Sequence, residues 1–457
     1  MANISSLPLG RQWTTTLSDL QLAEKAPIAS DNRETYIFEL DGQLSCNSDG
    51  DPLVAAAGSN NSIKIYSRNR LTNVAHLKGH SETLTGIRFG HRNPNLVYTS
   101  SRDGTVRCWD VRAKKSKAQQ VFTGYPGNKF TSFDVNCTDT IVCAGTESVG
   151  EDAYIIFWDC RSTNLLGAYK ESHSDDVTQA GHNHFVIQQV KFHPTNADAL
   201  ATGSTDGLVC VFDISQRSEE NALVTTLNSE SSVSRMDWCG ANSEYIYCLT
   251  HTEQIMIWDA VESTRITKFD DIRQNLGERG IEVEYLVDCF YNSSLKTLVV
   301  LGGTHSGNLR LLTVGKEVLH PVNTLNGGHG STVRCLQWDN STESLITGGE
   351  DGMLSLWTKE GKIEELSKER PQRETRKVRT MHAEKLPKKM QRLKIRHTTK
   401  PYKKQCDATK SQQRDITMQV QCDNAKTVQC DNVVVHCDNA VVHCDNAVGQ
   451  TDNDNAN

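Results

Sequence analysis

The stretch SSRDGTVRCWDV, Ser100 to Val111, decides the fold of this chain of 457 residues. Its Asp-Gly pair predicts a tight turn, and the residues that follow alternate between apolar and polar, as in a strand with one buried face. Three more segments repeat a turn followed by an apolar strand: Gly203–Ile214, His251–Val261 and Gly348–Lys359. In the three copies that contain Asp-Gly, the Asp lies six positions before a terminal Trp or Phe. Such fixed spacing indicates one structural unit that recurs along the chain.

A Gly-His pair marks the start of two of these units. His80 and His329 each precede a run of alternating residues, and the terminal Trp follows 29 and 28 positions later, at Trp109 and Trp357. This layout resembles the WD-repeat family, whose unit is about 40–45 residues long and carries a Gly-His and a Trp-Asp pair. The resemblance implies an all-β fold, the β-propeller, in which each blade is a four-stranded sheet.

Seven units fit between residues 36 and 361, at about 46 residues each. One blade cannot bury both of its faces, so neighbouring blades in a ring must cover them. We therefore predict a seven-bladed WD-repeat propeller over residues 36–361. The third strands are expected near Ser62–Tyr66, Val106–Asp110, Tyr154–Asp159, Leu208–Asp213, Ile255–Asp259, Asn308–Leu312 and Met353–Trp357.

The ring needs a closing strand, because only three strands follow the last turn signal. We assign the fourth to Trp13–Leu20 (WTTTLSDL), within an N-terminal segment of residues 1–35. Blade one is then expected to begin at Tyr36, with the sequence YIFELDG.

The resemblance also assigns a hydrogen-bonded tetrad of His, Ser or Thr, Asp and Trp to the complete units. By register it comprises His80, Thr99, Asp103 and Trp109 in blade two, His329, Thr347, Asp351 and Trp357 in blade seven, and His173, Thr202 and Asp206 in blade four, where Phe212 replaces Trp. A hydroxyl, a His and an Asp could also suggest nucleophilic catalysis. An active site is normally single, whereas this set recurs with the blade, so we predict a structural role and no enzyme, cofactor or metal site.

Two consecutive units end their third strand with Trp-Asp-x-Arg, at Arg112 and Arg161. Both arginines are expected at the turn to the fourth strand, as neighbours on one face. The paired motif resembles that of propellers that serve as substrate receptors of cullin-4 ubiquitin ligases, where the arginine docks on the large adaptor of the ligase. The alternative is an arginine paired with a local acid on a solvated turn.

Unit four contains about ten extra residues, Ala180–Gln189, before the inner strand that ends at Val190–Pro194. They predict either a binding loop with Phe185 as its anchor, or a by-product of gene prediction or splicing that the fold extrudes. His182, His184 and His193 do not have the spacing of a standard zinc site.

Two tails of opposite character follow the repeats. Residues 362–404 hold 16 Lys and Arg against 5 Glu, and Lys385–Arg396 (KLPKKMQRLKIR) is typical of a nuclear localisation signal or an RNA-binding patch. The alternative is a solvated tail. Residues 405–457 repeat Cys-Asp-Asn, which predicts low-complexity disorder. Their Cys and His residues also suggest zinc, but a repeat expansion explains the same pattern.

The composition limits the function further. The net charge of −7 is too small to predict a nucleic-acid or membrane partner for the whole molecule. We find neither a signal peptide nor a membrane span, and read the fifteen cysteines as reduced, in a protein that is cytoplasmic, nuclear or both and not secreted. We predict an interaction scaffold for protein partners. The alternatives are a cullin-4 substrate receptor that uses Arg112 and Arg161, and a nuclear RNA-associated factor that uses the basic tail.

Overall fold

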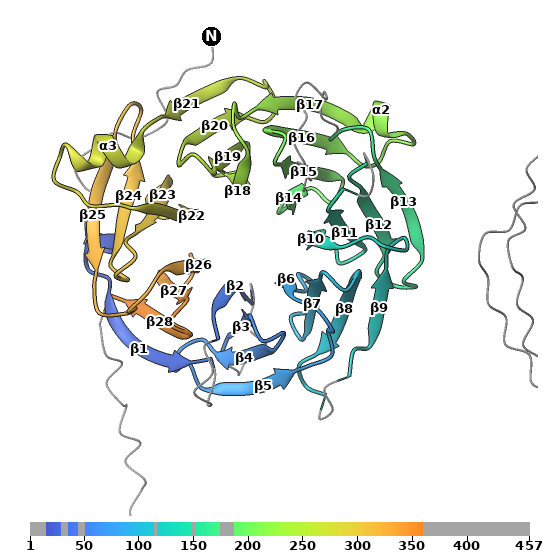
Figure 1. Cartoon of the computed structure of the whole chain (residues 1–457), viewed down its shortest axis with the longest axis horizontal. Coiled ribbons are helices and arrows are strands. Elements are labelled where there is room, and N and C mark those ends of the chain that lie inside the picture. The colour runs from blue at the N-terminus through green and yellow to red at the C-terminus, as the bar shows by residue number, and fades with distance from the viewer. Residues whose placement is uncertain are drawn as a thin grey trace, which may run out of the picture. The chain divides into compact units, whose positions relative to one another are not determined.

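The computed structural model describes residues 15–28, 35–43, 51–113, 117–148, 152–173 and 187–359. Its strands form seven four-stranded antiparallel sheets, arranged as the blades of a ring (Figure 1). The predicted seven-bladed propeller is confirmed.

The blades follow one another along the chain, and each begins with its innermost strand. Blades one to three are β2 (Ile37–Gly42), β3 (Leu53–Gly58), β4 (Ile63–Ser67) and β5 (Asn73–Leu77); β6 (Leu84–Phe89), β7 (Leu96–Ser101), β8 (Thr105–Asp110) and β9 (Gln120–Thr123); and β10 (Phe130–Val135), β11 (Ile141–Thr146), β12 (Ile155–Asp159) and β13 (Leu165–Tyr169). Blades four and five are β14 (Ile187–Phe192), β15 (Ala199–Ser204), β16 (Leu208–Asp213) and β17 (Leu223–Asn228); and β18 (Val233–Cys239), β19 (Tyr245–Thr250), β20 (Ile255–Asp259) and β21 (Arg265–Phe269). Blades six and seven are β22 (Tyr285–Asn292), β23 (Thr297–Gly303), β24 (Leu309–Val314) and β25 (Leu319–Leu325); and β26 (Val333–Asp339), β27 (Ser344–Gly349), β28 (Met353–Thr358) and β1 (Gln21–Pro27).

All seven third strands lie where the repeat predicts them, from β4 in blade one to β28 in blade seven. The described residues include three short helices: α1 (Thr15–Ser18) precedes β1, whereas α2 (Glu219–Ala222) and α3 (Ile272–Gly277) lie between strands. None of the described helices is long and apolar enough to cross a membrane.

The ring is closed by the N-terminal strand β1, which pairs antiparallel with β28 from Gln21 opposite Thr358 to Pro27 opposite Met353. The predicted closing segment, Trp13–Leu20, is wrong. Its part Thr15–Ser18 forms helix α1, and Trp13 lies outside the described residues. The threonines of this segment favour a strand by propensity, but the burial of Leu17 and Leu20 favours the helical turn.

Helix α1 has its own place in the core. Leu17 and Leu20, three positions apart, are buried against blades six and seven, beside Leu325 and Trp357. The side chain of Asn323 donates hydrogen bonds to the carbonyl oxygens of Leu17 and Leu20, at 2.9 and 3.1 Å. Contacts with the outer strand of blade six therefore fix a helical turn where the sequence predicts a strand.

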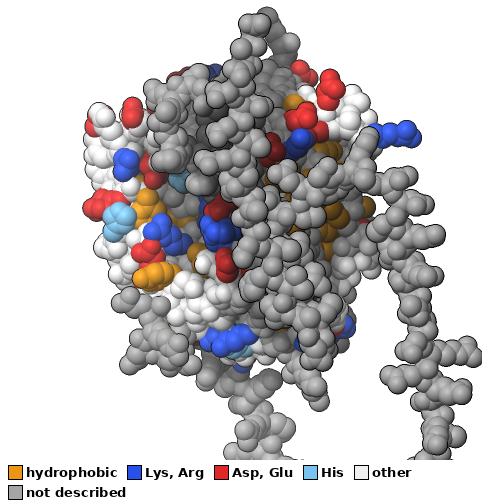
Figure 2. Space-filling model, turned by 45° about the vertical axis from the view of Figure 1, so that its right-hand side comes forward, with side chains coloured by type: hydrophobic (Ala, Val, Ile, Leu, Met, Phe, Trp, Pro, Cys, Tyr) orange, Lys and Arg blue, Asp and Glu red, His pale blue; other side chains and the backbone are white. Residues whose placement is uncertain are grey.

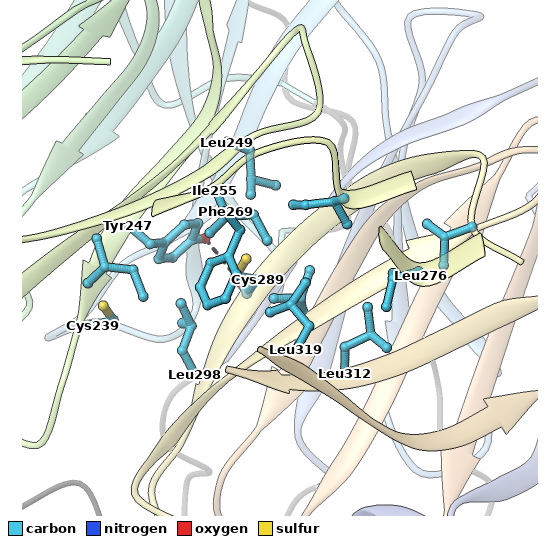
Figure 3. Packing of buried hydrophobic residues seen from close by; sticks show 14 residues of the cluster. Cys239, Tyr247, Leu249, Ile255, Phe269, Leu276, Cys289, Leu298, Leu312 and Leu319 are labelled. Atoms are coloured by element: carbon cyan, nitrogen blue, oxygen red, sulfur yellow. Dashed lines mark hydrogen bonds between the residues drawn. The ribbon is translucent and has the colours of Figure 1, made fainter. Parts of the chain in front are cut away.

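The core consists of separate clusters between neighbouring blades. Figure 3 shows the cluster between blades five and six, where Tyr247 and Phe269 face Leu312 and Leu319. Ile272 and Leu276 of α3 complete it. The Tyr247 hydroxyl donates to the Cys289 carbonyl at 3.0 Å. Each cluster draws side chains from two blades, which is how the ring buries faces that no single blade could cover.

Candidate interaction sites

The structure brings the predicted tetrad of blade two together. His80 Nδ1 lies 2.9 Å from Asp103 Oδ2, and His80 Nε2 lies 2.9 Å from Thr99 Oγ1. The Trp109 indole donates to the same Thr99 oxygen at 2.8 Å. Asp103 also accepts from the amides of Ser81 and Thr105, so the tetrad ties the entry loop of the blade to its tight turn.

Blade seven repeats this arrangement. His329 Nδ1 lies 3.1 Å from Asp351 Oδ1, His329 Nε2 lies 2.8 Å from Thr347 Oγ1, and the Trp357 indole donates to Thr347 at 2.9 Å. The His and Thr side chains are buried, out of reach of a substrate. Recurrence and burial both support a structural role.

In blade four the tetrad lacks its indole. His173 Nδ1 lies 2.9 Å from Asp206 Oδ2 and Nε2 lies 2.8 Å from Thr202 Oγ1, while Phe212 occupies the position of Trp. In the complete tetrads the Thr oxygen also accepts an indole N–H, and Phe212 cannot supply this hydrogen bond to Thr202.

The pKa of His173 is set by its burial and by its hydrogen-bond partners. Burial alone would lower the pKa of this His, but hydrogen bonds with Asp206 and Cys210 outweigh it and raise the pKa to about 10. In blade two, burial would raise the pKa of Asp103, but the hydrogen bonds from His80 and Thr105 hold that pKa well below its usual value.

The two predicted arginines lie at the turns from third to fourth strand in blades two and three. Arg112 donates through Nε and Nη2 to Asp110, at 2.9 and 2.7 Å, and Arg161 donates in the same way to Asp159, at 3.1 and 2.9 Å. Their side chains are 63% and 79% exposed. The pairing with a local acid is therefore present, and it fixes both guanidinium groups at the surface.

The turn of Arg161 contacts the outer strand of blade two. Gln120, at the start of outer strand β9 in blade two, donates through Nε2 to the carbonyl oxygen of Cys160 at 2.7 Å. Cys160 immediately precedes Arg161. The first-to-second strand turns are also joined, because Asp139 of blade three accepts the amides of His91, Arg92 and Asn93 in blade two. Blades two and three therefore form one continuous edge on this face.

Sequence reasoning missed an ion-pair network in the centre of the ring. The carboxylate of Glu39 in blade one lies 3.0 Å from Nη1 of Arg88 in blade two and 3.2 Å from Nη1 of Arg235 in blade five. Arg88 also lies 3.5 Å from Asp134 of blade three. Blades one and five are not neighbours, so Glu39 and Arg235 meet at the centre of the ring, which the inner strands surround in Figure 1.

A signal for this network exists in the sequence. The inner strands carry a polar residue at one equivalent register position, and six of the seven are charged: Asp41, Arg88, Asp134, Lys191, Asp237, Asp288 and Gln337. A charge inside an otherwise apolar strand, repeated in each unit, could have predicted a polar channel.

The outer surface is mixed in character. In Figure 2 charged side chains of both signs are scattered between hydrophobic and uncharged ones. Among the described residues no group of three or more His, Cys, Asp and Glu could hold a metal ion. His193, one of three histidines weighed as ligands, caps a turn by accepting the amides of Thr195 and Asn196 at its Nδ1.

Several predicted features lie outside the described residues. Of the inserted stretch Ala180–Gln189 only residues 187–189 are described, and they belong to inner strand β14. Phe185, His182, His184, Lys385–Arg396 and the Cys-Asp-Asn repeats are not described. The interpretations of these segments stay predictions.

Comparison with known proteins identifies the class. Three stretches match the family model described as WD domain, G-beta repeat: residues 71–110, 174–213 and 319–358. The fold is a seven-bladed β-propeller, and three of its stretches are similar to the WD repeat. Propellers of this class generally act as binding platforms without catalysis.

The chain is similar to several WD-repeat proteins. It is 28% identical over 318 residues to WD repeat-containing protein 89 homolog of Dictyostelium discoideum, covering 69% of this chain and 82% of that protein. It is 27% identical over 349 residues to WD repeat-containing protein GTS1 of Arabidopsis thaliana, covering 73% and 83%. An uncharacterized WD repeat-containing protein of Schizosaccharomyces pombe is 23% identical over 346 residues, covering 72% and 96%. The likeness to WD repeat-containing protein 89 that Phe122–Asn136 and Gly348–Trp357 predict is confirmed.

Proposed function

We propose that this protein is a non-enzymatic scaffold that holds a protein partner on the edge formed by the third-to-fourth strand turns of blades two and three. The observation that carries the proposal is the pair of exposed arginines, Arg112 and Arg161, in equivalent turns of two blades that are hydrogen-bonded to each other on this face. Arginine is enriched at interface positions that contribute most to affinity, because its planar fork makes two parallel hydrogen bonds to acidic groups or carbonyls.

The pairing of each arginine with an aspartate of its own turn favours the binding of a partner. Asp110 and Asp159 each accept the backbone amide of their arginine as well as its side chain, which orders the turn before a partner arrives. A guanidinium that is already ordered loses less conformational entropy on binding than a free one. The buried tetrad of blade two further fixes the sheet that carries Arg112.

The finer proposal is that the partner is the large adaptor of cullin-4 ubiquitin ligases, which would make this protein a substrate receptor. It rests on the paired Trp-Asp-x-Arg motif and on the exposure of both arginines in adjacent blades. Affinity purification of the full chain from cells is expected to recover the adaptor. The variant Arg112→Ala/Arg161→Ala should reduce that recovery at least about tenfold, as expected for the loss of two central interface residues.

The matched control is Arg217→Ala, an exposed arginine after the third strand of blade four. It should leave the recovery unchanged. Equal recovery with the wild type and the double variant would refute docking through these arginines. If other proteins were lost from the double variant while the adaptor was never present, the scaffold would stand and the cullin-4 proposal would fail.

A further inference from the structure

Exposed aliphatic side chains lie beside the two arginines. Leu165 and Leu166 begin the outer strand β13 of blade three, directly after the turn that carries Arg161, and are 43% and 58% exposed. Val121 of β9, the outer strand of blade two, is 42% exposed. Single exposed aliphatics are ordinary, but three of them next to paired guanidinium groups form a surface of mixed chemistry.

A β-bulge accounts for the exposure of Leu166. In the pairing of β12 with β13, Trp158 lies opposite Leu165 and Phe157 opposite Gly167, so Leu166 has no partner. A bulge redirects the extra side chain, here away from the sheet and outward. The edge of β13 is also the outer edge of its blade, so no further strand of that sheet covers it.

At this edge the basic side chains are exposed and the acidic ones are largely buried. Arg92 and Lys117 are exposed and add to Arg112 and Arg161. The described acids of the same turns are turned inward: Asp110, Asp139 and Asp159 are 14%, 11% and 19% exposed, and each accepts hydrogen bonds from its own turn or its neighbour. A partner therefore meets the cations and the aliphatic groups rather than the carboxylates.

We propose that this basic–aliphatic edge, defined by Arg92, Arg112, Lys117, Val121, Arg161, Leu165 and Leu166, binds a protein segment that carries both carboxylates and aliphatic side chains. The proposal rests on the proposed function and deepens it, since it names the chemistry of the partner at that same edge. The carboxylates would bind the guanidinium groups and the aliphatic side chains would cover the leucines.

A nucleic acid is the other polyanion that exposed arginines could bind. Single-stranded nucleic acid is held by stacking its bases on aromatic side chains as well as by charge. In the described parts of these turns and outer strands, Phe122 is buried and Tyr169 packs between Phe157 and Phe212, which leaves no exposed ring for a base. Exposed leucines instead favour a partner with aliphatic groups.

The test uses the full chain and a phage-displayed library of random 16-residue peptides, with counter-selection against the variant Arg112→Ala/Arg161→Ala/Leu165→Ser/Leu166→Ser. Selected peptides are expected to combine Asp or Glu with Leu, Ile or Val. A labelled peptide from this pool should bind the variant Leu165→Ser/Leu166→Ser at least about tenfold more weakly in fluorescence anisotropy. Labelled oligouridine should bind more weakly than the peptide.

Blade four offers a matched control. Val224 is 59% exposed at the same bulged position of outer strand β17, but Ser215 replaces the arginine in its turn. Val224→Ser should bind the peptide like the wild type. Peptides without acidic residues, full binding by the leucine variant, or tighter binding of oligouridine would each overturn the proposal. If the leucine variant binds normally while Arg112→Ala/Arg161→Ala loses its cellular partners, this inference fails and the proposed function stands.

Discussion

One residue separates the tetrad of blade four from those of blades two and seven. Phe212 has no hydrogen to give Thr202, whereas Trp109 and Trp357 each donate to their Thr. The indole N–H fills one of the two acceptor positions of the Thr oxygen in blades two and seven, and blade four lacks this hydrogen bond. Burial would lower the pKa of His173, but its hydrogen bonds with Asp206 and Cys210 outweigh burial and raise that pKa.

Asp206→Asn is expected to lower the pKa of His173 from about 10, because the hydrogen bond with Asp206 is the largest of the effects that raise it. With the raised pKa, protonated His173 adds stability that is full below pH 6.5 and is lost as the pH rises towards 10. The variant should lose this dependence. NMR titration of the imidazole in wild type and variant, with denaturation at pH 6 and 9, measures both effects. An unchanged pKa of His173 in a folded variant would contradict this role of Asp206.

The tetrads could be predicted from the sequence because their spacing is local. Asp103 and Trp109 lie six positions apart on one hairpin, and His80 enters the same blade. The ion pair between Glu39 and Arg235 could not be predicted in the same way, because 196 positions separate its members. Their contact depends on the number of blades and the width of the ring, which no local pattern encodes.

The N-terminal element does two jobs at the closure of the ring. Strand β1 supplies the fourth strand of blade seven, and α1 covers the outer part of blade six. Sequence reasoning found that the fourth strand comes from the N-terminus but placed it at Trp13–Leu20, because threonines favour strands. The actual strand has the sequence QLAEKAP, in which apolar and charged residues do not alternate regularly. The boundary between α1 and β1 therefore becomes clear only from the pairing of β1 with β28 and from the burial of Leu17.

Leu17→Ala is expected to destabilise the propeller, although Leu17 lies outside all seven sheets. Its side chain is fully buried, and truncating such a Leu costs roughly 2–5 kcal/mol from lost burial and the cavity left behind. Denaturant unfolding measures the change. Asp19→Ala, at an exposed neighbour, should shift the free energy of unfolding by less than about 0.5 kcal/mol. Equal stability of the two variants would mean that α1 contributes nothing to closure.

At the scale of the whole molecule, the ring is fastened at its centre as well as at its rim. The rim is closed by strand exchange, whereas the centre is tied by Glu39, which lies between Arg88 and Arg235 from two other blades. Burial would raise the pKa of Glu39, but the two guanidinium groups, Arg235 first, outweigh it and lower that pKa. Burial raises the pKa of Asp288 in the same channel, because its attraction to Arg235 and Lys191 does not compensate.

These opposite shifts predict opposite effects of removing the two charges. The pKa of Glu39 is lowered, so its charge stabilises the fold above its usual pKa near 4.5, and this stability is lost as the pH falls. Glu39→Gln should therefore cost roughly 3–5 kcal/mol at pH 7, because it leaves buried arginines without their partner. The pKa of Asp288 is raised, so its charge reduces stability as the pH rises through that value. Asp288→Asn keeps an acceptor for the Tyr247 hydroxyl and should be neutral or stabilising at pH 7.

Denaturant unfolding of both variants and the wild type at pH 7 and pH 4.5 decides the matter. Lowering the pH to 4.5 should shrink the difference between wild type and Asp288→Asn, because the raised pKa lets Asp288 take up a proton. The difference for Glu39→Gln should shrink less, because the lowered pKa of Glu39 keeps its charge in the folded protein at this pH. If both variants lost the same stability at pH 7, the centre of the ring would be equally sensitive to the loss of either charge. The ion pairs of Glu39 would then have no special part in holding blades one, two and five together. A large loss confined to Glu39→Gln would instead mean that three blades far apart in the sequence are coupled through one carboxylate, so that the ring resists opening from its centre outward.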